Sequence, residues 1–395
     1  MFNRIKQLRL ARGLSLELLA SRMDGLVTKQ SISKYETGRA KPSNVVLVRL
    51  ASALGVKAIT LWTEPGYAIE LLAYRKGSGL QKKEKERVEN HVRFALEQRV
   101  KLQELQGQLD RFNLKVGGYP ISRPEQAEVA AESLRQTWNL GYDPIASMVA
   151  VLEDHAIHAE SIEANPRFDG ISAVARDDKG KTVSAMLVSR AGLSGERQRL
   201  NFAHELGHLF LKCTSSADEE KAAFRFGAAF LAPRDLMVAD AGARRTAFSI
   251  QELLLLKQRY GLSLQALLYR LRDLGIITEG HYRQWCMEIR SRGWSKKEPR
   301  ETVEEKPQWL QRTVQKALTE GYMSAYEASL FGIVADAAVP LRGKRQFAKL
   351  PKTEQAKYLH QQADAALKHY STDESWKEFQ KGGLVEHGRR KPQEG

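Results

Sequence analysis

The sequence predicts a mainly α-helical protein with one α+β portion, and two patterns in its 395 residues support this fold class. Over most of the chain before residue 336, apolar residues recur at helical spacing between turn-forming glycines and prolines. Residues 157–189 instead alternate apolar and polar side chains and are rich in β-branched residues, which is typical of short strands. A chain of this length is long enough for two or three domains, each with its own hydrophobic core.

Composition and turn signals divide the chain into five segments. A compact helical segment comes first. A charged helical linker follows, then a small domain of helices plus a short sheet, a helical subdomain and a basic tail without a recognisable pattern. The expected bounds of these segments are, in the same order, residues 1–65, 66–116, 117–245, 246–335 and 336–395.

The charge of the chain points to a polyanionic partner. It holds 62 Lys and Arg residues against 47 Asp and Glu residues, a formal net charge of +15. Residues 1–60 contain eleven basic and three acidic side chains, so a net charge of +8 is concentrated in the first segment. This distribution favours nucleic acid as the partner.

The cysteines and the hydropathy of the chain argue for a reducing, aqueous compartment. Cys213 and Cys286 lie far apart and show no Cys-x-x-Cys spacing, so we expect neither a disulfide framework nor a cysteine-ligated zinc site. No window approaches 18 apolar residues, and the N-terminus lacks a long apolar run. We therefore expect no membrane span, no signal peptide and a cytoplasmic location.

Residues 1–65 are expected to form a bundle of five short helices. Gly13 ends the first helix, Ser15 is placed to cap the second, and Gly55 follows the fourth. The third helix begins with short or hydrogen-bonding side chains, which suit base edges in the major groove of DNA, and the basic loop after it suits phosphates. The predicted DNA-binding residues are Thr28, Lys29, Gln30, Ser31, Ser33 and Lys34 in the helix, and Arg39 and Lys41 in the loop.

Gln30 through Glu36, followed by Pro42 and Ser43, resemble the signature of the XRE family of helix-turn-helix repressors. The resemblance implies a domain that binds an operator or promoter in double-stranded DNA. In the family, the second helix often has Gln after its cap. This sequence has Leu16 there, so one phosphate contact of the family is expected to be missing. The alternative interpretation of the third helix is a solvated polar helix in an ordinary small bundle.

Residues 82–110 are expected to form one long charged helix. It opens with a run of alternating charges from Lys82 to Arg87 and carries an intermittent apolar side. Such a helix can serve as a solvated connector, as a seam between two copies or as a lid. The apolar positions are Val88, Val92, Leu96, Leu102, Leu105 and Leu109.

The third segment is expected to combine helices with a short sheet. Helices are predicted over residues 124–138 and 143–154. Strands are predicted over 157–162, 171–176 and 182–189, with turns at 169–170 and 177–180.

A candidate metal site follows in residues 200–210, which contain His-Glu-x-x-His. His204 and His208 are four residues apart, so on a helix both imidazoles lie on one face and can bind one metal ion. Glu205 points off that face. It can reach a metal-bound water instead, so it is the predicted catalytic general base.

A third ligand is needed, because catalytic zinc sites usually combine three protein ligands with one open position. A second helix, rich in alanine and aromatic residues, is predicted to lead from Glu220 to a stop at Pro233. Glu220 lies in its first turn and faces the first helix if the two pack antiparallel, so it is the predicted third ligand. Its neighbours Asp218 and Glu219 remain alternatives.

These two helices resemble the ImmA/IrrE family of bacterial metallopeptidases: an HELGH helix, then a Glu leading into an Ala- and Phe-rich helix that ends in Pro. The resemblance implies a zinc-dependent protease that cleaves a helix-turn-helix repressor. It places the family motif on His204, Glu205, His208 and Glu220. The ligand types and the motif favour Zn²⁺, with Mn²⁺ as an alternative.

Two positions depart from the usual family pattern. Phe224 stands where Asn is common and Gly227 where Ala is common, and we expect neither to touch the ligands. A strand beside the metal helix is expected to offer its edge to an extended peptide, a common way to bind the chain that is cut.

The remaining segments give weaker predictions. Residues 250–271 show a helix, a glycine turn, a serine cap and a second helix, which fits a packing subdomain or a second nucleic-acid reader. A charged linker is expected over 292–308 and two short helices over 309–334. Residues 351–370 have helical spacing, and 371–395 are polar and basic, which favours partial disorder.

Together, these features predict a cytoplasmic regulator of transcription that binds DNA and hydrolyses a peptide bond in a regulatory protein. The implied substrate is a helix-turn-helix repressor, a toxin–antitoxin partner or the chain itself, in a stress-responsive or mobile-element setting. A homodimer is compatible with the long helix. The alternative is a non-proteolytic DNA-binding repressor or antitoxin whose metallopeptidase-like domain binds a partner protein or senses metal.

Overall fold

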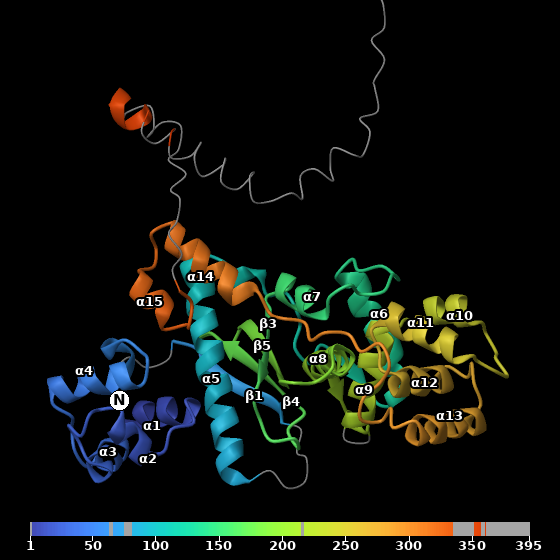
Figure 1. The fold of residues 1–395 in the computed structure, drawn as a ribbon, viewed down its shortest axis with the longest axis horizontal. Helices are drawn as coiled ribbons and strands as arrows, with labels where there is room; N and C mark the ends of the chain where they lie inside the picture. Colours follow the sequence, from blue (N-terminus) through green and yellow to red (C-terminus); the bar gives the residue numbers. More distant parts are fainter. Residues whose placement is uncertain are drawn as a thin grey trace, which may run out of the picture. The chain divides into compact units, whose positions relative to one another are not determined.

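The computed structural model describes residues 2–62, 66–74, 81–214, 217–334, 351–356 and 360. The chain divides into two compact units, residues 1–335 and 336–395. The first unit is mainly α-helical with a small mixed sheet, as the sequence predicts (Figure 1). In the second unit, the described residues include one helical turn at 352–356, and most of the helix predicted over 351–370 lies outside the described residues.

The N-terminal bundle contains α1 (Phe2–Ala11), α2 (Leu16–Ser21), α3 (Lys29–Glu36), α4 (Asn44–Ala53) and the 3-10 helix η1 (Ala58–Leu61). The fifth helix of the prediction is therefore a short 3-10 turn. The hydroxyls of Ser15, Thr28 and Ser43 cap α2, α3 and α4 by accepting from the backbone N–H three residues on. The guanidinium of Arg9 donates to both carboxylate oxygens of Glu36, at 2.6 and 2.9 Å, and ties α1 to the end of α3.

The central sheet has the strand order β1-β4-β5-β3. Its strands are β1 (Ala68–Tyr74), β3 (Ile157–Ile162), β4 (Gly170–Arg176) and β5 (Thr182–Arg190). β1 and β5 pair antiparallel with β4, and β3 pairs parallel with β5. A separate parallel pair joins β2 (Tyr119–Ile121) to β6 (Leu211–Cys213).

The interpretation of residues 66–116 as a helical linker needs one correction, because residues 68–74 form β1. Its sequence, AIELLAY, is short and lacks a clean alternation, since Leu71 and Leu72 are adjacent. The register explains the pattern: a β-bulge between Leu71 and Ala73 inserts Leu72 as an extra residue. The strand is thus stabilised by its pairing with β4, which lies about 100 positions further along the chain.

The long helix α5 (Lys82–Leu105) is an internal packing helix. One side buries Val88, Val92 and Leu96 against the sheet, in a cluster with residues of β4 and β5. The other side meets α1, where the guanidinium of Arg4 contacts the carboxylate of Glu97 at 2.6 Å. The expected roles as a solvated connector or lid do not describe a helix buried on two sides (Figure 1).

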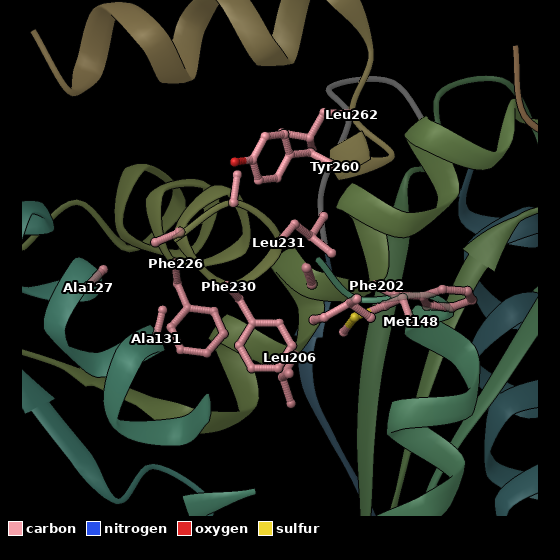
Figure 2. Close-up of a cluster of buried hydrophobic side chains, with 14 of the residues drawn as sticks. Ala127, Ala131, Met148, Phe202, Leu206, Phe226, Phe230, Leu231, Tyr260 and Leu262 are labelled. Atoms are coloured by element: carbon pink, nitrogen blue, oxygen red, sulfur yellow. The ribbon is translucent and has the colours of Figure 1, made fainter. Parts of the chain in front are cut away.

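The helices around the predicted metal site are η3 (Pro124–Gln126), α6 (Ala127–Thr137), α7 (Met148–Asp154), α8 (Gly195–Phe210), α9 (Glu219–Leu231) and α10 (Arg234–Ala241). α7 begins five residues later than predicted, since the Arg135 guanidinium binds the carbonyls of Gly141 and Asp143 and Ser147 caps the helix. Figure 2 shows the core between these helices, where Phe226 and Phe230 of α9 lie near Leu206 of α8.

Three further helices, α11 (Ile250–Tyr260), α12 (Leu264–Asp273) and α13 (Glu279–Ser291), pack on this core. Leu264, Leu267, Leu268 and Leu271 of α12 are buried, and the fully buried Arg270 donates to both carboxylate oxygens of Glu128. This burial favours the packing subdomain over a second nucleic-acid reader. The helices α14 (Trp309–Thr319) and α15 (Ala325–Ser329) complete the described part of the first unit.

Residues 292–308 were expected to form a charged linker, but the acidic side chains within 295–308 are structural partners. Glu305 accepts hydrogen bonds from Arg199 and from the backbone N–H of Val149. Glu298 contacts the ammonium of Lys257 at 3.0 Å, and Lys257 also donates to Glu196 at the start of α8. The segment thus fastens the N-terminal end of α8. Among the described residues, no helix is long and apolar enough to span a membrane.

One half-buried carboxylate, Glu160 on β3, should make the stability of this fold depend on pH. Burial by itself raises the pKa of Glu160, but the Arg99 guanidinium at 2.7 Å and the hydrogen bond with His91 lower that pKa to about 2. A carboxyl group with a lowered folded pKa stabilises the fold above its unfolded pKa of about 4.3, and this contribution disappears as the pH falls through the folded value.

We therefore expect the free energy of unfolding to decrease as the pH falls from about 4.3 towards about 2, and the Glu160→Gln variant to lose much of this slope. Urea denaturation at a series of pH values measures this pH dependence of the free energy of unfolding. The exposed Glu320→Gln change serves as the control and should leave the slope intact. An unchanged slope in Glu160→Gln would show that this carboxylate does not carry the effect.

Candidate metal centre

Three side chains from two helices meet at one point. His204 and His208 come from α8 and Glu220 from the first turn of α9, and their ligand atoms all lie within 4.8 Å of one another. The two Nε2 atoms are 3.1 Å apart, and a Glu220 carboxylate oxygen lies 3.5 Å from each of them. Among the described residues, this is the only group of His, Cys, Asp and Glu side chains with such geometry.

The alternatives to Glu220 take other roles. The carboxylate of Asp218 caps α9 by accepting from the backbone N–H of Lys221, and a hydrogen bond from that N–H lowers its pKa. Glu219 lines the cavity beside the histidines but does not belong to the group of converging ligand atoms. The structure therefore favours Glu220 among the three acidic neighbours that the sequence left open.

Two glycines let α8 and α9 come close enough for this arrangement. A Cβ atom on Gly227 would lie 3.0 Å from the backbone nitrogen of His204, and one on Gly207 would lie 3.2 Å from the Cα of Ala223. Both contacts are with backbone, which cannot easily move away. Gly227 was expected not to touch the ligands, but it packs against the backbone of His204, and its missing side chain allows this approach of α9.

Phe224 also contacts a predicted ligand, contrary to expectation. Its ring centroid lies 4.3 Å from that of His204, at an interplanar angle of 51°. His204 is fully buried, so the phenyl ring forms part of the wall that holds this imidazole in place. The sequence does indicate this contact: Glu220 and Phe224 are four residues apart, so they share one face of α9.

Glu205 lies outside the converging group. Its carboxylate is 2% exposed and lies against Gly170, the first residue of β4. A Cβ atom at Gly170 would fall 2.5 Å from Oε1 of Glu205, so only glycine fits there without displacing the carboxylate. Gly170 is thus a site residue that sequence reasoning missed. The Asp169-Gly170 turn was noticed only as the start of a strand.

The three converging residues fit a divalent metal ion. Two ligands bound at about 2.0–2.1 Å to a tetrahedral ion lie roughly 3.3 Å from each other, and the observed separations are 3.1, 3.5 and 3.5 Å. A carboxylate 3.5 Å from both nitrogens is too far for good hydrogen bonds. Two imidazoles and one carboxylate are the donor set of many hydrolytic zinc sites.

The predicted DNA-binding residues lie together on and after α3. Thr28, Lys29, Gln30 and Lys34 are exposed, as are Arg39 and Lys41 in the loop, whereas Ser31 and Ser33 are half-buried. Ile32 is fully buried and anchors the helix to the bundle. Lys29 donates to Glu17 of α2 at 2.9 Å, and this bond lowers the pKa of Glu17 to about 2. In this structure the Lys29 ammonium is thus engaged with Glu17 in an exposed ion pair.

Comparison with protein-family models gives two matches. Residues 5–61 match the helix-turn-helix model, and residues 170–272 match the IrrE N-terminal-like domain of the M78 peptidases. The chain joins a helix-turn-helix domain to an IrrE-like domain. The second match covers β4, β5 and α8 to α12, and so includes all of the converging residues and Glu205. No curated protein shows significant similarity to the chain.

Two cavities border the candidate metal centre of the IrrE-like domain. One, of about 440 Å³, is lined by His208 and Glu220 together with Leu72 of β1 and Cys213. Burial raises the pKa of the Cys213 thiol, so it is protonated near neutral pH. The other cavity, of about 770 Å³, is lined by Phe224, by aromatic residues of α12 and α13 and by charged residues of α9.

The geometry predicts which acidic residue binds the metal. Loss of an outer-shell partner typically weakens metal binding by about 10–100-fold, so loss of a direct ligand should cost at least that much. We expect Glu220→Ala to weaken Zn²⁺ binding by at least about tenfold, measured by calorimetric titration with a competing chelator. Glu219→Ala is the matched control and should bind as the wild type does. Equal loss in both variants would contradict the assignment.

Proposed function

We propose that the protein is a DNA-binding regulator of transcription whose IrrE-like domain is a zinc-dependent endopeptidase. The observation that carries this proposal is the convergence of His204, His208 and Glu220, with the separate carboxylate of Glu205 placed at the start of β4. This arrangement separates metal holding from proton transfer, as a metal hydrolase requires. Zn²⁺ is preferred over Mn²⁺ because two imidazoles form most of the donor set.

The chain's own residues would divide the work as follows. When bound, Zn²⁺ lowers the pKa of a coordinated water to about 7 and polarises the scissile carbonyl. The carboxylate of Glu205 accepts the proton of the attacking water and later delivers it to the leaving amine. Gly170 leaves room for that carboxylate, and the ring of Phe224 holds the His204 imidazole. Glu205 is 2% exposed, so the residues packed around it keep bulk water away from the proton transfer.

The substrate that we propose is a repressor-type regulatory protein, either a helix-turn-helix partner or the chain itself. The argument is that a helix-turn-helix domain and an IrrE-like domain are joined in one chain. A toxin–antitoxin partner is compatible with the same reasoning, and a cut in any of these proteins would relieve repression. Regulation in a stress response and action in the cytoplasm follow from this proposal.

A second candidate function is a non-proteolytic repressor whose IrrE-like domain binds a partner or senses metal. One observation favours it: the edge of β4 that faces away from β5 is paired with β1, so β4 has no open edge for a peptide. A peptidase in this arrangement would have its substrate edge covered. The two candidates therefore differ in whether any peptide bond is cut once metal is bound.

The proposed peptidase predicts that Glu205→Gln retains stoichiometric Zn²⁺ and the wild-type circular dichroism but cuts nothing. We expect Gly170→Ala to keep the metal too, and to lower the cleavage rate by about 10²-fold, which is typical when a general base is displaced. Gly280→Ala on α13, where the nearest atom is 3.9 Å away, is the matched control.

The assay follows the intact mass of the metal-loaded protein and of the helix-turn-helix repressors encoded near it. A cut in the wild type that is absent in Glu205→Gln supports the peptidase. Cleavage retained in Glu205→Gln would remove Glu205 from the mechanism, and bound metal without any cut would favour the non-proteolytic repressor.

DNA binding predicts two different effects within α3 and its loop. Arg39→Ala should weaken binding to all sequences and reduce the slope of log affinity against log salt by about 1, because one phosphate contact is lost. Gln30→Ala should cost about 1–3 kcal/mol at the operator and relax specificity at one base pair. Fluorescence anisotropy with the protein's own promoter and with unrelated DNA separates these effects. The exposed Arg283→Ala on α13 is the control.

A further inference from the structure

β1 occupies the one edge of β4 that β5 leaves free. It pairs antiparallel with β4 along all of β1, from Ala68 opposite Arg176 to Tyr74 opposite Ile171. The next residue of β4 is Gly170, which lies against the Glu205 carboxylate. The end of β1 is therefore next to the predicted catalytic base. Proteases bind the chain that they cut in an extended form, often by pairing it with a sheet edge.

β1 also reaches into the metal cavity. Leu72 lines the same 440 Å³ cavity as His208 and Glu220 and is half-buried there, packed against the core that contains α8 and α9. Its neighbours Ile69 and Leu71 point the other way, into the cluster with α5. This difference is the ordinary alternation of side chains along a strand, in which residues 69 and 71 share one face and residue 72 lies on the other, the metal side of the sheet.

The bulge separates β1 from a true substrate. A peptide bound for cleavage keeps a regular ladder across the scissile bond, which holds its carbonyl in place. In β1 the ladder shifts register between Leu71 and Ala73, at the residue whose side chain faces the metal cavity. The strand therefore fills the position of a substrate without presenting a regularly paired peptide bond. β1 also lies outside the family match, which begins at residue 170.

We propose that β1 is a resident strand that holds the substrate position beside the metal centre, and that a peptide substrate binds only after β1 leaves the edge of β4. This inference rests on the proposed peptidase function and adds its regulation. The attachment of β1 on the α5 side consists of Ile69 and Leu71 in the apolar cluster and a hydrogen bond from Arg93 to the Ile69 carbonyl. On the solvent side, an exposed ion pair joins Glu70 to Arg176 at 2.9 Å.

The experiment uses the full-length, Zn²⁺-loaded protein and two hydroxamates, so that it requires no cleavage. Acetohydroxamate is small and binds the metal alone. The hydroxamate of malonyl-Leu-Ala amide carries the residue pair found at Leu72 and Ala73 and needs the edge of β4 as well. The variants are Leu72→Ala, which empties the cavity, and Ile69→Ala, which loosens β1 on the α5 side without touching the cavity. Glu70→Ala is the control on the exposed face.

We expect acetohydroxamate to bind the wild type and all variants with equal affinity. We expect the peptide hydroxamate to bind Leu72→Ala and Ile69→Ala about tenfold more tightly than the wild type, because its apparent affinity scales with the fraction of molecules in which β1 has left β4. Hydrogen exchange of residues 67–74 in the wild type should become faster when the peptide hydroxamate binds and should not change with acetohydroxamate.

Three results would overturn the proposal. The first is that the peptide hydroxamate binds the wild type and both variants with equal affinity. The second is that only Leu72→Ala binds it more tightly. The third is that residues 67–74 stay protected from hydrogen exchange when the peptide hydroxamate is bound. The second result would mean that Leu72 only narrows the cavity, and the third that the peptide adds to the outer edge of β1. Failure of the proposed peptidase would look different. Acetohydroxamate would then bind neither the wild type nor any variant, or it would bind while the intact-mass assay shows no cleavage.

Discussion

The close contact between α8 and α9 is the constraint on which the rest of the site depends. Gly207 and Gly227 remove the side chains that would separate the two helix backbones, and Glu220 comes within reach of both histidines as a result. Protein interiors are close-packed, so one added methyl group at such a contact is felt by its neighbours. The arrangement of the three candidate ligands is therefore set by the packing of these two helices.

Buried ionic groups fix the position of α8 from its other end. Glu196 in the first turn is buried, which alone raises its pKa, but hydrogen bonds from Lys257 and from the backbone of Thr302 lower that pKa below its ordinary value. The Arg199–Glu305 pair connects the same helix to residues 295–308, and Lys257 of α11 bridges Glu196 of this helix and Glu298. Removing one partner of such a pair leaves an uncompensated buried charge, which is strongly destabilising. Long-range charge pairs thus hold the histidines in register with Glu220.

Most of the local structure could be predicted because it is encoded locally. The serine and threonine caps of α2, α3 and α12, the i, i+4 spacing of His204 and His208, and the alternation in β4 and β5 are all visible within a few residues. The candidate ligand Glu220 could be chosen because the first turn of a helix faces back along its neighbour. The family resemblances added the helix-turn-helix and IrrE-like domains, and the family comparisons confirmed both.

The predictions that were wrong share one physical cause: the residues that determine the structure of a segment lie far away from it in the sequence. β1 is a strand because β4 pairs with it, and residues 295–308 are ordered because α7, α8 and α12 carry the matching donors. Gly170 matters only through Glu205, which is 35 positions later. A stretch such as AIELLAY or a run of alternating charges does not show which element it will meet. From the sequence alone, a run of charged residues suggests an exposed segment, because the residues that form ion pairs with it are not known.

The helix contact at Gly207 and Gly227 has a consequence for how such proteins diversify. Because Glu220 is placed by helix packing, the connection over residues 211–218 does not have to hold it in position. That connection borders the smaller cavity through Leu211 and Cys213. Replacements there can reshape this cavity while the three candidate ligands keep their arrangement. The shape of the cavity and the arrangement of the candidate ligands can therefore change separately, the first through the connection between α8 and α9 and the second only by coordinated changes in two packed helices.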